Sequence, residues 1–65
     1  MTNRLAKRLK QLRAERGLTQ AVLAQRAGLT LSYIGRIEIG RHDPRLSTLR
    51  KLAKALKVTV ADIVK

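Results

Sequence analysis

The sequence predicts a small all-α domain made of five short helices, and three observations support this prediction. First, the chain has only 65 residues, which allows one domain at most, covering residues 1–65. Second, its apolar residues are almost all Leu, Ile, Val and Ala, and they recur at helical spacing without the alternation of a strand. Third, Gly, Ser and Thr residues, which commonly end or begin helices, separate these apolar segments.

The first helix is predicted from one apolar face, whose residues are spaced at i, i+4 and i+7: Leu5, Leu9 and Leu12. Gly17 is suited to end this helix because a residue without a Cβ adopts the left-handed backbone easily. Thr19 is the expected N-cap of a second helix from Gln20 to Ala27, which Gly28 is expected to end. This helix turns small or apolar residues inward: Leu23, Ala24 and Ala27.

The third helix is predicted to run from Leu31 to Glu38 or Ile39, with Thr30 as its N-cap. Its inward residues are two isoleucines: Ile34 and Ile37. Because few apolar residues remain on its outer side, this helix is expected to offer that side to solvent or to a polar partner.

The last two helices follow a loop over residues 40–46 that contains the only proline, Pro44. Ser47 is the expected N-cap of the fourth helix. The apolar face of that helix has four members: Leu49, Leu52, Ala53 and Leu56. Thr59 is expected to cap a short fifth helix with three apolar residues: Val60, Ile63 and Val64.

Charge is the strongest feature of the composition, since 15 Lys and Arg against four Asp and Glu give a net charge of +11. This balance predicts an anionic partner, with nucleic acid and an acidic membrane surface as the two classes. A basic surface kept only for solubility is the weaker interpretation, because like charges repel one another. Most of six basic residues of the first and fourth helices are expected to form a solvated, steering face: Arg4, Lys7, Arg8, Arg50, Lys51 and Lys54.

Membrane insertion and export have no support in the sequence. No apolar run approaches the roughly 20 residues of a membrane span. The basic first ten residues lack the continuous apolar core of a signal peptide. The sequence therefore predicts a cytoplasmic protein.

Two helices joined by a short turn at Gly28 form the pattern of a helix-turn-helix, here over about residues 20–39. Glycine permits the sharp reversal, and the small Ala24 lets the two helices approach closely. A generic helical hairpin in a five-helix bundle would explain the same apolar positions. It would not explain why the outer face of the third helix carries so few apolar residues in so basic a chain.

The helix-turn-helix segment reads QAVLAQRAGLTLSYIGRIEIG from Gln20 to Gly40, and it resembles the phage repressor/Cro (xenobiotic-response-element) family. The resemblance continues through RHDPRLSTLRKLAKALKVTVADIV and reaches back into the basic first helix, so it covers nearly the whole chain. It implies a five-helix lambda-repressor-like domain that binds double-stranded DNA as a transcriptional regulator. It further implies a repressor that binds a palindromic operator as a homodimer, formed in solution or only on DNA.

In this family the third helix lies in the major groove, which implies that its outward residues meet base edges: Thr30, Leu31, Ser32 and Arg36. Arg36 is the expected reader of guanine because its planar fork bonds O6 and N7 together, and a phosphate contact is the alternative. Leu31 departs from the polar residue often found there, so it either contacts a thymine methyl or reads nothing. Gly35 either permits a close approach to DNA or has lost an unimportant side chain. Ile39, a second departure, is expected to contact a sugar or a partner.

Three residues are expected at DNA phosphates: Gln20, Tyr33 and Arg41. The resemblance implies the role of Gln20, whose alternative is a bond within its own helical turn. Tyr33 either places its hydroxyl on a phosphate or only packs its ring over the turn. Arg26 and Arg45 are weaker candidates for the same contact.

Glu38 ends the DNA-facing helix, where a bare carboxylate would repel phosphate. The resemblance implies that Arg13 of the first helix pairs with this residue. We therefore expect a partly buried Arg13–Glu38 ion pair that fixes the third helix against the first. Removing one partner of a buried pair can cost about 3–5 kcal/mol.

Other classes of function find less support. The chain has no Cys, no Ser/His/Asp arrangement and no phosphate-binding glycine loop, so neither enzyme activity nor a cofactor is expected. His42, beside Asp43, is the only histidine, so no metal site is expected, and so small a core predicts no small-molecule ligand. A membrane-active or RNA-binding basic peptide is the second class. The helix caps favour a folded domain instead, and Tyr33 is the only aromatic residue available to stack on RNA bases.

The partner beyond DNA stays open at the level of sequence. An antitoxin or a restriction-modification controller that acts with a protein partner fits the same residues. If the chain forms a homodimer by itself, four residues supply the available apolar surface: Pro44, Val60, Ile63 and Val64.

Overall fold

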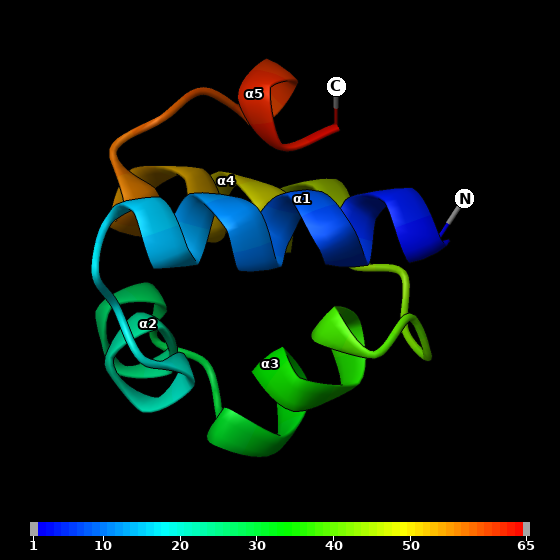
Figure 1. The fold of residues 1–65 in the computed structure, drawn as a ribbon, viewed down its shortest axis with the longest axis horizontal. Coiled ribbons are helices and arrows are strands. Elements are labelled where there is room, and N and C mark those ends of the chain that lie inside the picture. The colour runs from blue at the N-terminus through cyan, green and yellow to red at the C-terminus, as the bar shows by residue number, and fades with distance from the viewer. Residues whose placement is uncertain (1, 65) are drawn as a thin grey trace.

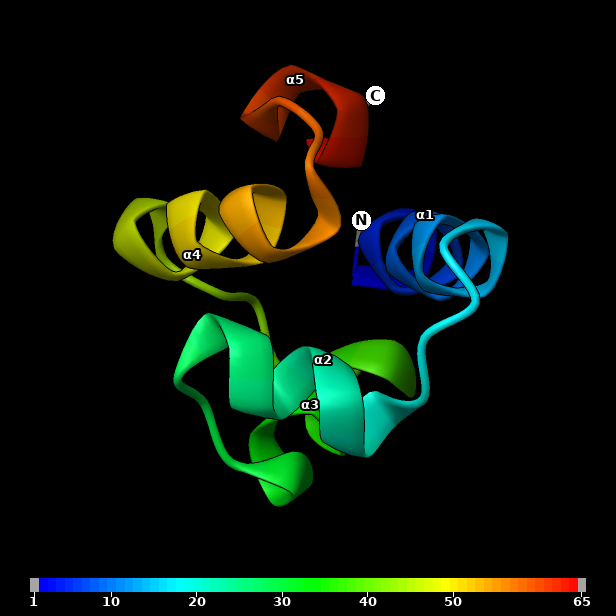
Figure 2. The same cartoon turned by 90° about the vertical axis from the view of Figure 1, so that its left-hand side faces the viewer.

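In a computed structural model, which describes residues 2–64 with side chains from residue 4 onward, the chain forms five helices. They are α1 (Thr2–Glu15), α2 (Gln20–Ala27), α3 (Leu31–Glu38), α4 (Leu46–Leu56) and α5 (Val60–Val64). No strand occurs among the described residues, and the predicted all-α fold is confirmed. Helix α5 contacts both α1 and α4, while α2 and α3 lie on the other side of these two helices (Figures 1 and 2). None of the helices within residues 2–64 is long and apolar enough to cross a membrane.

The core is a single buried cluster to which all five helices contribute. Its members are Leu9, Leu12, Leu23, Ala24, Ala27, Ile34, Ile37, Leu52, Ala53, Leu56 and Ile63. Leu5 and Leu49, predicted on the same helical faces, are half-buried at its edge. Because truncating a buried Leu or Ile to Ala costs about 2–5 kcal/mol, this cluster fixes α2 and α3 firmly against α1 and α4.

Threonine caps begin three of the helices, as predicted. The Thr19 hydroxyl accepts a hydrogen bond from the Val22 N–H at 3.1 Å, and the Thr30 hydroxyl accepts one from the Tyr33 N–H at 3.1 Å. The cap of α5 is reciprocal. The Thr59 hydroxyl accepts from the Asp62 N–H at 3.1 Å, and the Asp62 carboxylate accepts from the Thr59 N–H at 2.9 Å. Each such cap stabilises a helix by about 1 kcal/mol.

The turn between α2 and α3 is made by Gly28, which has a left-handed backbone with φ +69°. The next residue, Leu29, donates its N–H to the carbonyl of Ala24 at 2.8 Å and so closes the C-terminal turn of α2. A residue with a Cβ would be strained at this φ. The backbone of Gly28 therefore sets the direction in which the chain enters α3.

The start of α4 differs from the prediction, because Ser47 is not its N-cap. The cap position is occupied by Arg45, with no side-chain hydrogen bond, and the helix begins two residues earlier than expected, at Leu46. The Leu49 N–H donates to the Arg45 carbonyl at 3.0 Å, which closes the first helical turn. Pro44, which precedes this N-cap, is buried. Tertiary packing at Pro44, and not a local hydroxyl, therefore positions the start of α4.

Candidate nucleic-acid interface

Helix α3 lies at the edge of the molecule, with one side against the core and the other in solvent (Figure 1). Its inward residues, Ile34 and Ile37, are fully buried. The four predicted base-reading residues are all exposed: Thr30, Leu31, Ser32 and Arg36. The structure thus places them together on the outer surface, along the N-cap and first turns of one helix.

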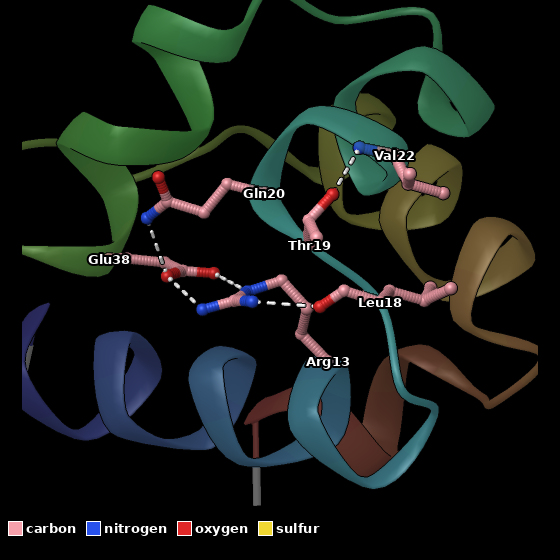
Figure 3. Close-up of polar contacts among 6 residues, drawn as sticks. All are labelled: Arg13, Leu18, Thr19, Gln20, Val22 and Glu38. Atoms are coloured by element: carbon pink, nitrogen blue, oxygen red, sulfur yellow. Dashed lines mark hydrogen bonds and ion pairs between the residues drawn. The ribbon is translucent and has the colours of Figure 1, made fainter.

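A hydrogen-bonded network around Glu38 holds the end of α3 (Figure 3). The Arg13 guanidinium binds the carboxylate through two bonds, Nε to Oε2 at 2.7 Å and Nη2 to Oε1 at 3.1 Å. The third nitrogen of Arg13, Nη1, donates to the Leu18 carbonyl at 2.8 Å. Gln20 completes the network, since its Nε2 donates to Glu38 Oε1 at 2.9 Å.

The network joins three helices and buries the only acidic group of α3. The side chain of Glu38 is 1% exposed and that of Arg13 is 20% exposed. Two parallel bonds between a guanidinium and a carboxylate are strong and also fix the relative orientation of the two groups. Helix α3 is therefore fixed to α1 by Arg13 and to the start of α2 by Gln20, and its carboxylate is kept away from the outer surface.

Gln20 has a structural role that the sequence did not reveal. It is half-buried at the first position of α2, and the sequence predicted it at a phosphate. Its amide nitrogen carries two N–H groups, and the bond to Glu38 uses one of them. One N–H and the carbonyl oxygen stay available for an external partner.

Tyr33 and His42 form a second contact that was not predicted. The Tyr33 hydroxyl lies 3.0 Å from His42 Nε2, and the two rings meet edge to face with centroids 4.8 Å apart. Both residues are half-buried, so the contact links the outer side of α3 to the loop that follows it. No spacing rule connects positions nine residues apart across a loop, which is why sequence patterns gave no signal for this pair.

The predicted phosphate-binding arginines lie in two places. Arg41 is exposed directly after α3, where its backbone N–H donates to the Arg36 carbonyl at 3.0 Å. Arg45 lines a depression beside Tyr33. Arg26 lies instead at the end of α2, in another depression that is also lined by two lysines of α4 and by the C-cap of that helix: Lys51, Lys54 and Lys57.

Two further arginines, Arg8 of α1 and Arg16 directly after that helix, bind backbone carbonyls of other helices. Arg16 Nε donates to the carbonyl of Leu56 at the end of α4, at 2.8 Å. Arg8 Nε donates to the carbonyl of Asp62 in α5, at 2.7 Å. Arg8 thus differs from the solvated steering face expected of most of these basic residues, because its guanidinium satisfies a helix carbonyl. The only sequence signal for both roles is the choice of Arg, with its several donors, at these positions.

Comparison with known proteins matches residues 9–63 to the helix-turn-helix family. The immunity repressor protein of Bacillus phage phi105 is 47% identical over 60 residues, which cover 92% of this chain and 42% of that repressor. The HTH-type transcriptional regulator DdrOP3 of Deinococcus deserti is 39% identical over 61 residues, which cover 94% of this chain and 47% of that regulator. This chain therefore spans less than half the length of these two relatives.

Solved structures give the same result for the fold. The restriction-modification controller protein C.AhdI from Aeromonas hydrophila superposes with a TM-score of 0.93 at 35% identity, covering 95% of this chain and 94% of the controller. The family match contains α2, the turn at Gly28 and α3 in full. This chain belongs to the helix-turn-helix family of the phage repressor/Cro type.

Proposed function

We propose that this chain binds double-stranded DNA in the cytoplasm with α3 in the major groove, and that it regulates transcription. One observation carries the proposal: the outer side of α3 is exposed and holds Ser32 and Arg36, while the Glu38 network fixes the helix from behind. An exposed but rigidly held helix is what reading base edges requires. The net charge of +11 supplies attraction to phosphates at long range.

In this proposal base reading and phosphate binding use different residues. Arg36 bonds guanine O6 and N7, and three neighbours complete the base-reading surface: Thr30, Leu31 and Ser32. Phosphates are bound by the free N–H of Gln20, by Tyr33 and by Arg41. Because the Tyr33 hydroxyl already contacts His42, its phosphate contact would use the second hydrogen-bonding capacity of that hydroxyl.

The proposal includes a homodimer on a palindromic operator, with two copies of α3 about 34 Å apart along the duplex. Among the apolar residues considered for the dimer contact, Ile63 and Pro44 are buried within the chain, whereas Val64 is exposed. A shallow depression at Val64 is also lined by Arg4 and Asp43. In a twofold dimer the same surface of both chains forms the contact, so Arg4 of one chain can pair with Asp43 of the other.

Repression is the proposed sign of regulation because the relative with 47% identity is named an immunity repressor. A second candidate is control of a restriction-modification system, which the likeness to C.AhdI over 94% of that controller favours. Both activities would use the same DNA-binding surface. The genes next to a selected operator would distinguish them.

Selection from random duplex DNA at about 150 mM salt tests the proposed function, because nonspecific phosphate binding is weak there. We expect enrichment of an inverted repeat with half-sites about one helical turn apart. Arg36→Ala should relax the preference at one guanine, a loss of about 1–3 kcal/mol of discrimination. Arg50→Ala, at an exposed arginine of α4, is the control and should keep the preference. Binding without any enriched sequence would contradict the proposal.

A further inference from the structure

Helix α3 carries an apolar stripe on its outer side. Leu31, Gly35 and Ile39 follow one another at i, i+4 and i+8, so they lie along one side of the helix and its C-cap. Leu31 is 52% exposed and Ile39 is 64% exposed, which places both among the few large apolar residues left in solvent within the described chain. Packing inside the chain therefore does not account for these side chains.

Gly35 makes the middle of this stripe flat. A Cβ built at Gly35 would meet no atom within 4 Å, so no neighbouring helix requires a glycine there. The residue is helical, and glycine is less favourable than alanine inside a helix. An unfavourable residue with no reason inside the fold indicates a partner that comes close to the backbone of α3.

One of the polar groups next to Leu31 already has a hydrogen-bond partner within the chain. The hydroxyl of Thr30 already serves as the N-cap of α3, bonded to the Tyr33 N–H at 3.1 Å. Ser32 and Arg36 form a separate polar line at i and i+4. The start of α3 therefore presents an alkyl side chain beside a hydrogen-bonding line.

We propose that Leu31 reads the C5-methyl group of a thymine in each half-site, and that Gly35 permits the close approach this contact needs. The inference rests on the proposed function and names the base that this end of α3 recognises. The thymine methyl is the apolar group that base pairs present in the major groove, so it matches an exposed leucine. Leu31 and Arg36 are roughly 7.5 Å apart along the axis of α3, so the thymine and the guanine are expected to belong to different base pairs of the half-site.

The test uses the operator selected by the parent chain and replaces each thymine of a half-site, one at a time, by uracil, which removes only the methyl group. We expect one position at which uracil lowers the affinity about fourfold, the effect of burying one methylene-sized group. Leu31→Ala should bind more weakly and no longer distinguish thymine from uracil at that position. Leu31→Met, which keeps an apolar side chain of similar volume, should retain part of the preference.

Leu46→Ala is the matched control, because it truncates a leucine that is 53% exposed, against 52% for Leu31, at the start of α4 and outside the base-reading helix, and it should keep the full thymine preference. Circular dichroism of each variant confirms that it is folded. If the parent chain binds its operator specifically but accepts uracil at every position, the inference is wrong while the proposed function stands. The same holds if Leu46→Ala, and not Leu31→Ala, abolishes the preference. If no operator is enriched, both the inference and the proposed function are overturned.

Discussion

At the scale of single residues, the carboxylate of Glu38 decides how α3 is held. It accepts two bonds from Arg13 and one from Gln20, and its side chain is only 1% exposed. A buried charge is tolerated when it is paired and hydrogen-bonded, as it is here. Loss of this carboxylate would leave the donors of two other elements without a charged acceptor.

Glu38→Gln keeps the shape of the side chain but removes its charge and turns an amide N–H₂ toward the Arg13 donors. We expect the free energy of unfolding to fall by about 3 kcal/mol, measured by urea denaturation, because one partner of a buried pair is lost. Glu15→Gln is the control, since Glu15 is exposed, and it should change stability by less than about 0.5 kcal/mol. Equal urea midpoints for the two variants would show that the pair does not stabilise the fold.

The sequence predicted some of the contacts of these residues and not others, and the difference has a physical reason. The Arg13–Glu38 pair spans 25 positions, and only the family resemblance, not any spacing rule, connected the two residues. The third partner, Gln20, and the contact between Tyr33 and His42 depend on how separate elements pack. Exposure of the outer side of α3, in contrast, follows directly from the 3.6-residue period of its apolar residues.

At the scale of helices, the sequence predicts the start of a helix wherever the N-cap side chain bonds to an N–H of the same short segment. Thr19, Thr30 and Thr59 each bond an N–H three residues ahead, within reach of their own short segment, and each was predicted. The N-cap of α4 was predicted wrongly at Ser47, because the burial of Pro44, a tertiary feature, positions the loop before this helix. The same distinction separates Gly28, which the turn requires, from Gly35, which the helix does not require.

Alanine at these two glycines should therefore change stability in opposite directions. Gly28→Ala forces a Cβ into the left-handed region and should lower the free energy of unfolding by about 1–2 kcal/mol. Gly35→Ala has open space and a helical backbone, and it should raise stability by up to about 1 kcal/mol. Thermal unfolding followed by circular dichroism measures both changes, and each variant is the control for the other. A stabilised Gly28→Ala would mean that the turn does not need a left-handed residue.

At the scale of the whole molecule, the helix proposed to read bases and the helix proposed for the dimer contact lie on opposite sides of α1 and α4, although the dimer contact also includes Asp43 in the loop after α3. Helix α3 is on one side of α1 and α4, and α5 is on the other (Figure 2). Two chains that meet through the end of α5 would therefore leave both copies of α3 uncovered. This separation is what simultaneous binding to two half-sites needs.

Val64→Asp places a charge on the exposed apolar residue of that proposed dimer contact. We expect the variant to stay folded but to dissociate at higher protein concentration in sedimentation equilibrium, and to lose affinity for the full palindrome more than for a single half-site. Ala61→Asp is the control, at an exposed position of the same helix outside the depression at Val64. Unchanged dimerisation of Val64→Asp would show that the dimer contact lies on another surface.

The arginines of α1 also limit how this protein can be redesigned. An engineer who wished to lower its charge, and so reduce nonspecific adhesion, would see Arg8, Arg13 and the adjoining Arg16 as interchangeable with the exposed lysines of α1. These three guanidiniums hold carbonyl or carboxylate oxygens outside α1, whereas Lys7 and Lys10 are exposed. Neutralising the lysines would change only the field around the molecule, and neutralising the arginines would also remove bonds to the rest of the chain. Charge reduction therefore has to begin with the lysines.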